Sequence, residues 1–170
     1  KISTDGISFI PSIGLISKNL KLVQELYFNL RDLESSNREA KILVDDENIY
    51  NLLKDENVEV GSFEGKYDNE RLALIETTKR LLEKYDIIVS KEGPVDLNGF
   101  GDTVFGHFDN KTKEIQVAAN KGFLRIANMA NCFALTVPSG ELSTAYVILC
   151  DTNNVSAIRK SFIIAESLYR

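Results

Sequence analysis

The sequence predicts an α/β fold in which a mixed β-sheet carries helices on both faces. Three observations lead to this prediction. Amphipathic helical periodicity alternates along the chain with short apolar runs of strand length. Residues 144–150 are apolar throughout, which is typical of a strand covered on both faces. A third pattern, over 103–118, predicts a β-hairpin, so the sheet need not be wholly parallel. An α+β arrangement of the same elements is the alternative.

The first part of the chain is predicted to hold one long helix and two short strands. Residues 1–14 are expected to form an extended entry segment, in which the apolar run 7–10 ends at Pro11. Apolar residues then recur every three or four positions from 17 to 33, which predicts an amphipathic helix. The elements that follow are a strand at 41–44, a brief helix or turn at 49–53 and a polar–apolar alternation at 58–60.

The rest of the chain supplies three further helices and the remaining strands. A helix capped by Asp68 or Asn69 carries the apolar stripe Leu72, Ile75, Leu82 and Tyr85. The predicted elements after it are a strand at 86–89, a hairpin of 103–108 with 114–118, a buried helix at 121–135, a central strand at 144–150 and a last helix capped by Asn153 or Asn154. The nearly all-round apolar character of 121–135 predicts the most buried helix of the domain.

The composition favours one globular domain spanning residues 1–170. The length is sufficient to bury roughly 70% of the unfolded surface, and the chain starts at Lys1, so we expect a domain excised from a longer chain or a processed product. The net charge of −5 and the scattered basic residues disfavour nucleic acid as a partner. No apolar run reaches the length of a membrane helix. These properties predict a soluble, cytoplasmic protein.

The cysteines and the lone histidine limit the metal and redox chemistry. Cys132 and Cys150 both lie in apolar patterns, where free cysteine behaves as a small hydrophobic residue, and we expect no disulfide between them. One histidine without a close cysteine pair offers too few ligands for structural zinc.

Acidic residues follow three predicted strands, at Asp45, Glu92 and Asp151. If those strands are parallel, their carboxyl ends share one edge of the sheet, where open α/β folds bind ligands. Carboxylates gathered there would suit Mg²⁺, so Asp45 and Asp151 are the candidate metal ligands. Alternatively, these acids only end the strands, because Asp and Asn are common turn and cap residues.

The segment 93–109 holds the only histidine and four of the ten glycines. If 103–108 forms a strand, His107 and Asp109 share one face, so Asp109 could orient His107 as a general base. Asp102 completes the candidate catalytic set. Gly99 and Gly101 would let the backbone approach a ligand. The alternatives are a strand histidine without chemistry and a simple mobile connection.

A further candidate ligand site lies at the start of the last helix, where backbone N–H groups near Asn153 could accept an anion. Together these features favour a domain that binds a small molecule near the 93–109 loop. If it is an enzyme, a metal-assisted hydrolase or transferase acting on a phosphorylated or polar metabolite fits best. The alternative is a non-catalytic sensor or interaction domain that docks a partner domain of a longer chain.

Overall fold

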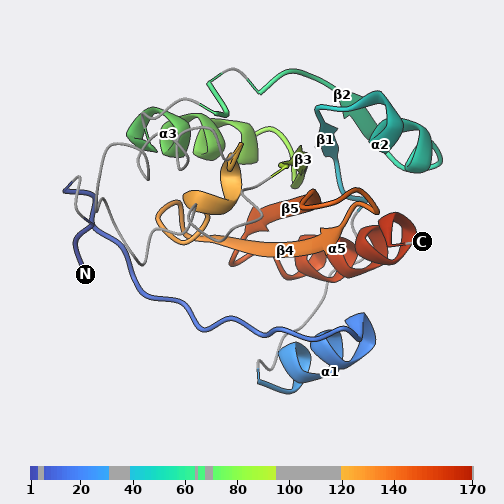
Figure 1. Cartoon of the computed structure of the whole chain (residues 1–170), viewed down its shortest axis with the longest axis horizontal. Helices are drawn as coiled ribbons and strands as arrows, with labels where there is room; N and C mark the ends of the chain where they lie inside the picture. The colour runs from blue at the N-terminus through green and yellow to red at the C-terminus, as the bar shows by residue number, and fades with distance from the viewer. Residues whose placement is uncertain (4–5, 31–38, 64, 68–70, 95–119, 170) are drawn as a thin grey trace.

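A five-stranded mixed sheet forms the centre of the computed structural model, which describes residues 1–3, 6–30, 39–63, 65–67, 71–94 and 120–169 (Figure 1). The strands are β1 (Ile42–Val44), β2 (Val58–Val60), β3 (Ile87–Glu92), β4 (Cys132–Pro138) and β5 (Ala145–Asp151). Their order across the sheet is β2-β1-β3-β5-β4. The predicted α/β fold with a mixed sheet is therefore confirmed.

The strand directions divide the sheet into two parts. β1 pairs in parallel with β2 on one side and with β3 on the other. β5 runs antiparallel to β3, with Ile87 opposite Cys150, and β4 runs antiparallel to β5. The carboxyl ends of β1, β2 and β3 consequently share one edge of the sheet, and the carboxyl end of β5 lies at the other edge.

Helices cover both faces of the sheet, as the sequence predicts. α1 (Leu20–Leu30), α2 (Glu47–Leu52) and α5 (Val155–Leu168) belong to one face, and α3 (Arg71–Leu82) with the 3-10 helix η2 (Phe123–Arg125) belongs to the other. Alternation along each strand sends successive side chains to opposite cores. The first core includes Ile42, Val44, Ile87, Val89, Ile148, Cys150, Ile158 and Phe162, and the second includes Leu43, Ile88, Val147, Leu149, Leu74, Ile75 and Phe123.

Two helices begin at capping side chains that lie in the short turn after a strand. The Asp46 carboxylate accepts hydrogen bonds from the N–H groups of Asn48 and Ile49 and so caps α2. The Asn154 side chain accepts one from Ala157 N–H and caps α5. Of the two caps considered for the last helix, Asn154 is the one used.

The prediction of a buried helix over 121–135 is wrong. Only the short η2 is helical there, turns follow it, and β4 begins at Cys132. Asn131 adopts a positive φ of 57°, a conformation that ends helical periodicity. From Phe133 onward, side chains on the α5 side of the sheet alternate with exposed ones, which is strand periodicity. The apolar character was nevertheless a correct sign of burial, because Phe123, Ile126 and Ala130 all lie in the core.

In residues 1–3 and 6–19, as far as the structure describes them, no strand is formed before α1, and an isolated bridge joins Ile2 to Ser8. The predicted hairpin at 103–118 and the predicted caps Asp68 and Asn69 lie outside the described residues. Among the residues the structure describes, none of the helices is both long and apolar enough to cross a membrane.

Candidate functional site

The carboxyl ends of β1 and β3 lie side by side at the point where the chain changes direction across the sheet. From β1 the chain passes to β2 on one side, and then returns over β1 to enter β3 on the other side. This is a topological switch point, the place where open α/β sheets bind ligands. Asp45 follows β1 here, and Ser90, Lys91 and Glu92 form the end of β3.

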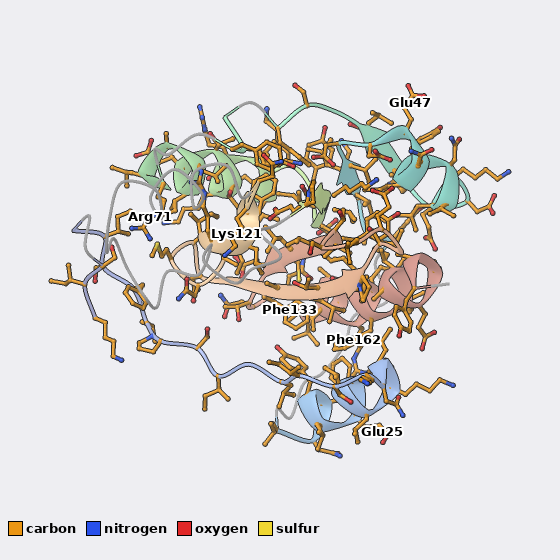
Figure 2. The ribbon with its side chains drawn as sticks, viewed as in Figure 1. Glu25, Glu47, Arg71, Lys121, Phe133 and Phe162 are labelled. Carbon is orange, nitrogen blue, oxygen red and sulfur yellow. The ribbon has the colours of Figure 1, made fainter. Side chains whose placement is uncertain are left out.

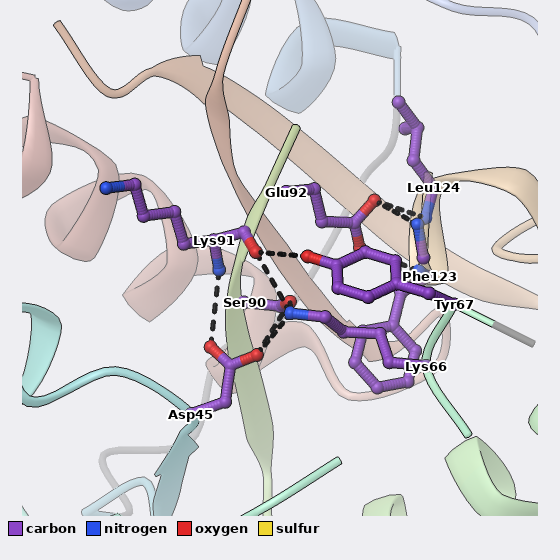
Figure 3. Close-up of polar contacts among 9 residues, drawn as sticks. Asp45, Lys66, Tyr67, Ser90, Lys91, Glu92, Phe123 and Leu124 are labelled. Carbon is purple, nitrogen blue, oxygen red and sulfur yellow. Dashed lines mark hydrogen bonds and ion pairs between the residues drawn. The ribbon is translucent and has the colours of Figure 1, made fainter. Parts of the chain in front are cut away.

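Lys66 brings a buried positive charge to this point from the connection between β2 and α3. Its ammonium group forms an ion pair with the Asp45 carboxylate and donates hydrogen bonds to Ser90 Oγ and to the Lys91 carbonyl oxygen, each at 2.9 Å (Figure 3). Three donors are available on an ammonium, and all three are used. The Tyr67 ring lies 4.7 Å from Lys66 Nζ, and its hydroxyl donates to the same Lys91 carbonyl at 3.2 Å.

The charge on Lys66 is stabilised mainly by Asp45. Burial by itself lowers the pKa of Lys66, but Asp45, with a smaller contribution from Tyr67, leaves the pKa above its ordinary value. The Asp45 carboxylate also accepts from Ser90 Oγ at 3.2 Å and from Lys91 N–H at 3.3 Å. Lys66 is therefore a fixed ammonium group near neutral pH, and it ties the β2–α3 connection to both strands.

Glu92, the last residue of β3, is a second buried charged group at this edge. Its carboxylate accepts hydrogen bonds from Gly122 N–H at 2.8 Å, Phe123 N–H at 2.6 Å and Leu124 N–H at 3.4 Å (Figure 3). Burial raises the pKa of Glu92, although these backbone donors and Lys66 act in the opposite direction. Glu92 thus fixes the start of η2 against the end of β3.

Two glycines allow this close packing. A Cβ at Gly122 would lie 2.6 Å from Lys66 Cγ and 2.9 Å from a Glu92 carboxylate oxygen. Gly93 adopts a φ of 105°, and a Cβ there would lie 2.5 Å from the Ser143 carbonyl oxygen. Gly93 N–H also donates to Asn120 O at 3.2 Å, so the residues on either side of the undescribed stretch 95–119 meet at the end of β3.

The expected convergence of three strand-end acids is only partly correct. Asp45 and Glu92 do lie at the same edge, but Asp151 lies at the opposite edge, because β5 runs antiparallel to β3. A metal site shared by Asp45 and Asp151 is therefore ruled out by the strand direction. Across the described ranges, no three His, Cys, Asp or Glu side chains come together as a group that could hold a metal ion.

Asn153 lies at the same edge as Asp151, away from the switch point. It is exposed, and its N–H donates to the Asp151 carboxylate at 2.7 Å. Asp151 thus acts within the turn before α5, as the alternative interpretation of the strand-end acids holds. The other candidate residues, Gly99, Gly101, Asp102, His107 and Asp109, lie outside the described residues and stay predictions.

Both cysteine thiols are free, in agreement with the prediction. Cys150 belongs to the core under α5, whereas Cys132 packs against the core on the other face of the sheet. Burial raises the pKa of each thiol to about 12, so neither is prepared to act as a nucleophile near neutral pH.

Sequence reasoning missed Lys66, Ser90 and Tyr67. Lys66 lies in an irregular connection, where a lysine is ordinarily solvated, and no periodicity surrounds it. The position of Ser90 gave a weak indication of a polar contact. It extends the apolar run 87–89 by one polar residue, whose hydroxyl group needs a hydrogen-bond partner if the buried strand continues.

No protein-family model matches the chain, and no curated protein sequence matches it.

Proposed function

We propose that this domain binds a small polar molecule at the carboxyl ends of β1 and β3. The observation that carries the proposal is the position of the ionisable network. Asp45, Lys66 and Glu92 gather at the topological switch point, where ligands of open α/β sheets bind.

The outer groups of the network are those a ligand would meet. Tyr67 is exposed and carries both an aromatic ring and a hydroxyl group. The Lys91 side chain leaves β3 on the opposite face and pairs with Glu141 at 2.6 Å, and this hydrogen bond raises the pKa of Lys91. Because the Lys66 ammonium is fully hydrogen-bonded, it would act on a ligand as a fixed charge behind Tyr67. A polar molecule with an aromatic or planar part is the class that suits this arrangement.

A thermal-shift series tests the proposal, because a ligand that binds only the folded state raises its apparent stability. Free nucleosides, nucleotides, amino acids and sugar phosphates are the probes. We expect at least one of these classes to raise the melting temperature of the wild-type chain, and the shift to be strongly reduced in Tyr67→Ala. The matched control is Tyr50→Ala, which changes a similarly exposed tyrosine on α2, over the other face of the sheet. The control should keep the shift. The proposal fails if no class shifts the melting temperature, or if both variants respond alike.

We propose that the domain binds its ligand as a non-catalytic sensor. The hydrogen bonding of the ionisable groups at the site favours a sensor over an enzyme. Within the described residues, Lys66 is a saturated ammonium, the Glu92 carboxylate is held by backbone donors, and both thiols have a raised pKa. None of these groups is arranged as a free base or nucleophile. Turnover of any ligand found in the screen would argue for an enzyme instead.

A further inference from the structure

The outer edge of β4 presents backbone groups that the sheet does not use. β4 is the last strand on the side of the sheet away from β2, and its pairing register with β5 leads on to Ser139 opposite Thr144. Ser139 N–H donates to the Thr144 carbonyl oxygen at 3.1 Å. Because the direction of the backbone groups alternates along a strand, the odd-numbered residues of β4 turn them toward β5. The even-numbered residues turn them outward.

Ala134 and Thr136 are the residues whose outward groups stay unused. Cys132 N–H donates to the Ala127 carbonyl oxygen at 2.8 Å, and Pro138 has no N–H. Ala134 and Thr136 are exposed, and their outward N–H and C=O groups have no hydrogen-bond partner in the part of the chain that the structure describes. The sequence of β4 also lacks the charged side chains that commonly protect an edge strand. The edge is therefore able to accept a further strand.

The segment 10–16, which we call the strap, also has unused backbone groups. Within the described ranges, none of its N–H or C=O groups takes part in a hydrogen bond. Its isoleucines Ile10, Ile13 and Ile16 are 79%, 96% and 101% exposed. The strap is as long as β4 and, like β4, its sequence contains no charged residue. Pairing it with a strand would therefore bury no charge.

The strap is held at both ends on the β4 side of the sheet. Before it, Ile7 packs against the core on the α3 side, and after it Leu20 and Val23 pack against the core on the α5 side. α1 is itself held at β4, because the Tyr27 and Phe133 ring centroids lie 5.1 Å apart, and Figure 2 shows Phe133 on the side of the sheet toward α1. Figure 1 shows the strap and α1 on the side of the molecule away from β2. The strap thus leads from one face of the sheet to the other on the side where the edge is open.

We propose that the strap closes onto the outer edge of β4 as an additional strand of the sheet, and that it is open in this structure. Extended peptides bind to exposed sheet edges by backbone pairing. Here the peptide belongs to the same chain and is fixed at both ends, so closure avoids the cost of bringing in a separate molecule. Closure would satisfy the outward groups of Ala134 and Thr136 and would protect the edge from pairing with other chains.

Pro11 determines which residues of the strap pair with β4. Proline occurs in an edge strand where the position of its missing N–H faces solvent. Since the backbone groups alternate, those of Ser12, Gly14 and Ile16 face β4 and those of Ile13 face away. In the open state Ile13 is almost fully exposed, and a Cβ at Gly14 meets no described atom within 4 Å. Substitutions at these two positions therefore act on the closed state and leave the open state intact.

Hydrogen exchange of single backbone amides, followed by NMR, tests the closure. In the wild-type chain, the amides of Ala134 and Thr136 should exchange at least about tenfold more slowly than in Gly14→Pro, which lacks the central donor of the strap. Ile13→Pro introduces the same residue at the neighbouring position, where the N–H faces solvent, and should keep the protection.

Two controls make the readout specific. The amides of Leu135 and Val137 point toward β5 and should stay protected in every variant, which shows that the sheet is intact. Sedimentation velocity identifies the concentrations at which the chain is a monomer. Protection of Ala134 and Thr136 should persist at those concentrations, because the strap and the edge belong to one chain.

Three outcomes would overturn the proposal. The first is equal exchange of Ala134 and Thr136 in the wild type and in Gly14→Pro, whether both are fast or both are slow, because the strap would then not cover the edge. The second is a loss of protection in Ile13→Pro as complete as in Gly14→Pro, which contradicts the proposed pairing. The third is protection that appears only in a dimer, which would mean that the edge pairs with a second copy.

Discussion

Replacing Lys66 with methionine should be among the most damaging single changes in this protein. Methionine retains most of the length and apolar surface of the lysine side chain but removes its charge and its three hydrogen bonds. Asp45 is then left as a nearly buried carboxylate that keeps, from the described part of the chain, the hydrogen bonds of Ser90 Oγ at 3.2 Å and Lys91 N–H at 3.3 Å. Both contacts are long for hydrogen bonds to a charged oxygen.

The expected loss follows from the burial of the pair. The side chains of Lys66 and Asp45 are 10% and 11% exposed, and removing one partner of a buried ion pair costs about 3–5 kcal/mol. Asp45→Asn leaves an amide oxygen in place and should cost less, about 1.5–3 kcal/mol, the value of a hydrogen bond to a charged group. The double variant should cost clearly less than the sum, because no unpaired charge remains.

Urea denaturation followed by far-UV circular dichroism measures these free energies of unfolding. The matched control is Lys160→Met, which breaks the more exposed pair of Lys160 with Glu56 and should cost about 0–1 kcal/mol. A loss below about 1 kcal/mol for Lys66→Met, or strictly additive single variants, would refute the reasoning.

The same pair gives a pH dependence of definite sign. The pKa of Lys66 is raised in the folded state by Asp45, even though burial alone would lower it. Its contribution to stability is therefore complete below the ordinary lysine pKa of about 10.4 and is lost as the pH rises through the folded-state pKa. Wild type should lose more stability than Lys66→Met when the pH is raised above that value. Equal losses would contradict this assignment.

Two further substitutions and one chemical modification have expected outcomes. Gly122→Ala places a methyl group 2.9 Å from a Glu92 oxygen and should lower the free energy of unfolding by about 1–3 kcal/mol in urea titrations. Asn154→Ala removes the cap of α5 and should cost about 1 kcal/mol by the same assay, whereas a change near zero would mean that the cap is unimportant. Cys132 and Cys150 should react with a thiol reagent at least about a hundredfold more slowly in the native protein than in denaturant, because the pKa of each is raised to about 12.

Local periodicity was sufficient to predict most of the elements. Short apolar runs predicted β1, β3 and β5, and apolar residues at helical spacing predicted α5. In the structure these apolar residues are the buried ones. The segment 121–135 shows the limit of this reasoning. Its short apolar run is compatible with both helix and strand, and in the structure Asn131 takes a positive φ directly before β4 begins.

The candidate site depended on information that periodicity does not contain. The sequence indicates that Asp151 follows a strand, but not in which direction that strand runs in the sheet. Pairing between residues distant in sequence sets this direction, and it moved Asp151 to the edge away from Asp45. Lys66 was missed for a related reason, since its partners at the end of β1 and in β3 lie 21–25 residues away along the chain.

The connectivity of the sheet also explains why a fully satisfied lysine lies where a ligand is expected. The chain must pass from β2 back over β1 to reach β3, and Lys66 lies on that connection and bonds to Asp45, just after β1, and to Ser90 in β3. Its first role is therefore to hold the strand order, and its charge at the switch point is a consequence. A ligand on this face would meet Tyr67 first, with the Lys66 ammonium behind it. Changes at Tyr67 should thus alter ligand affinity more than stability, and Lys66→Met should do the reverse.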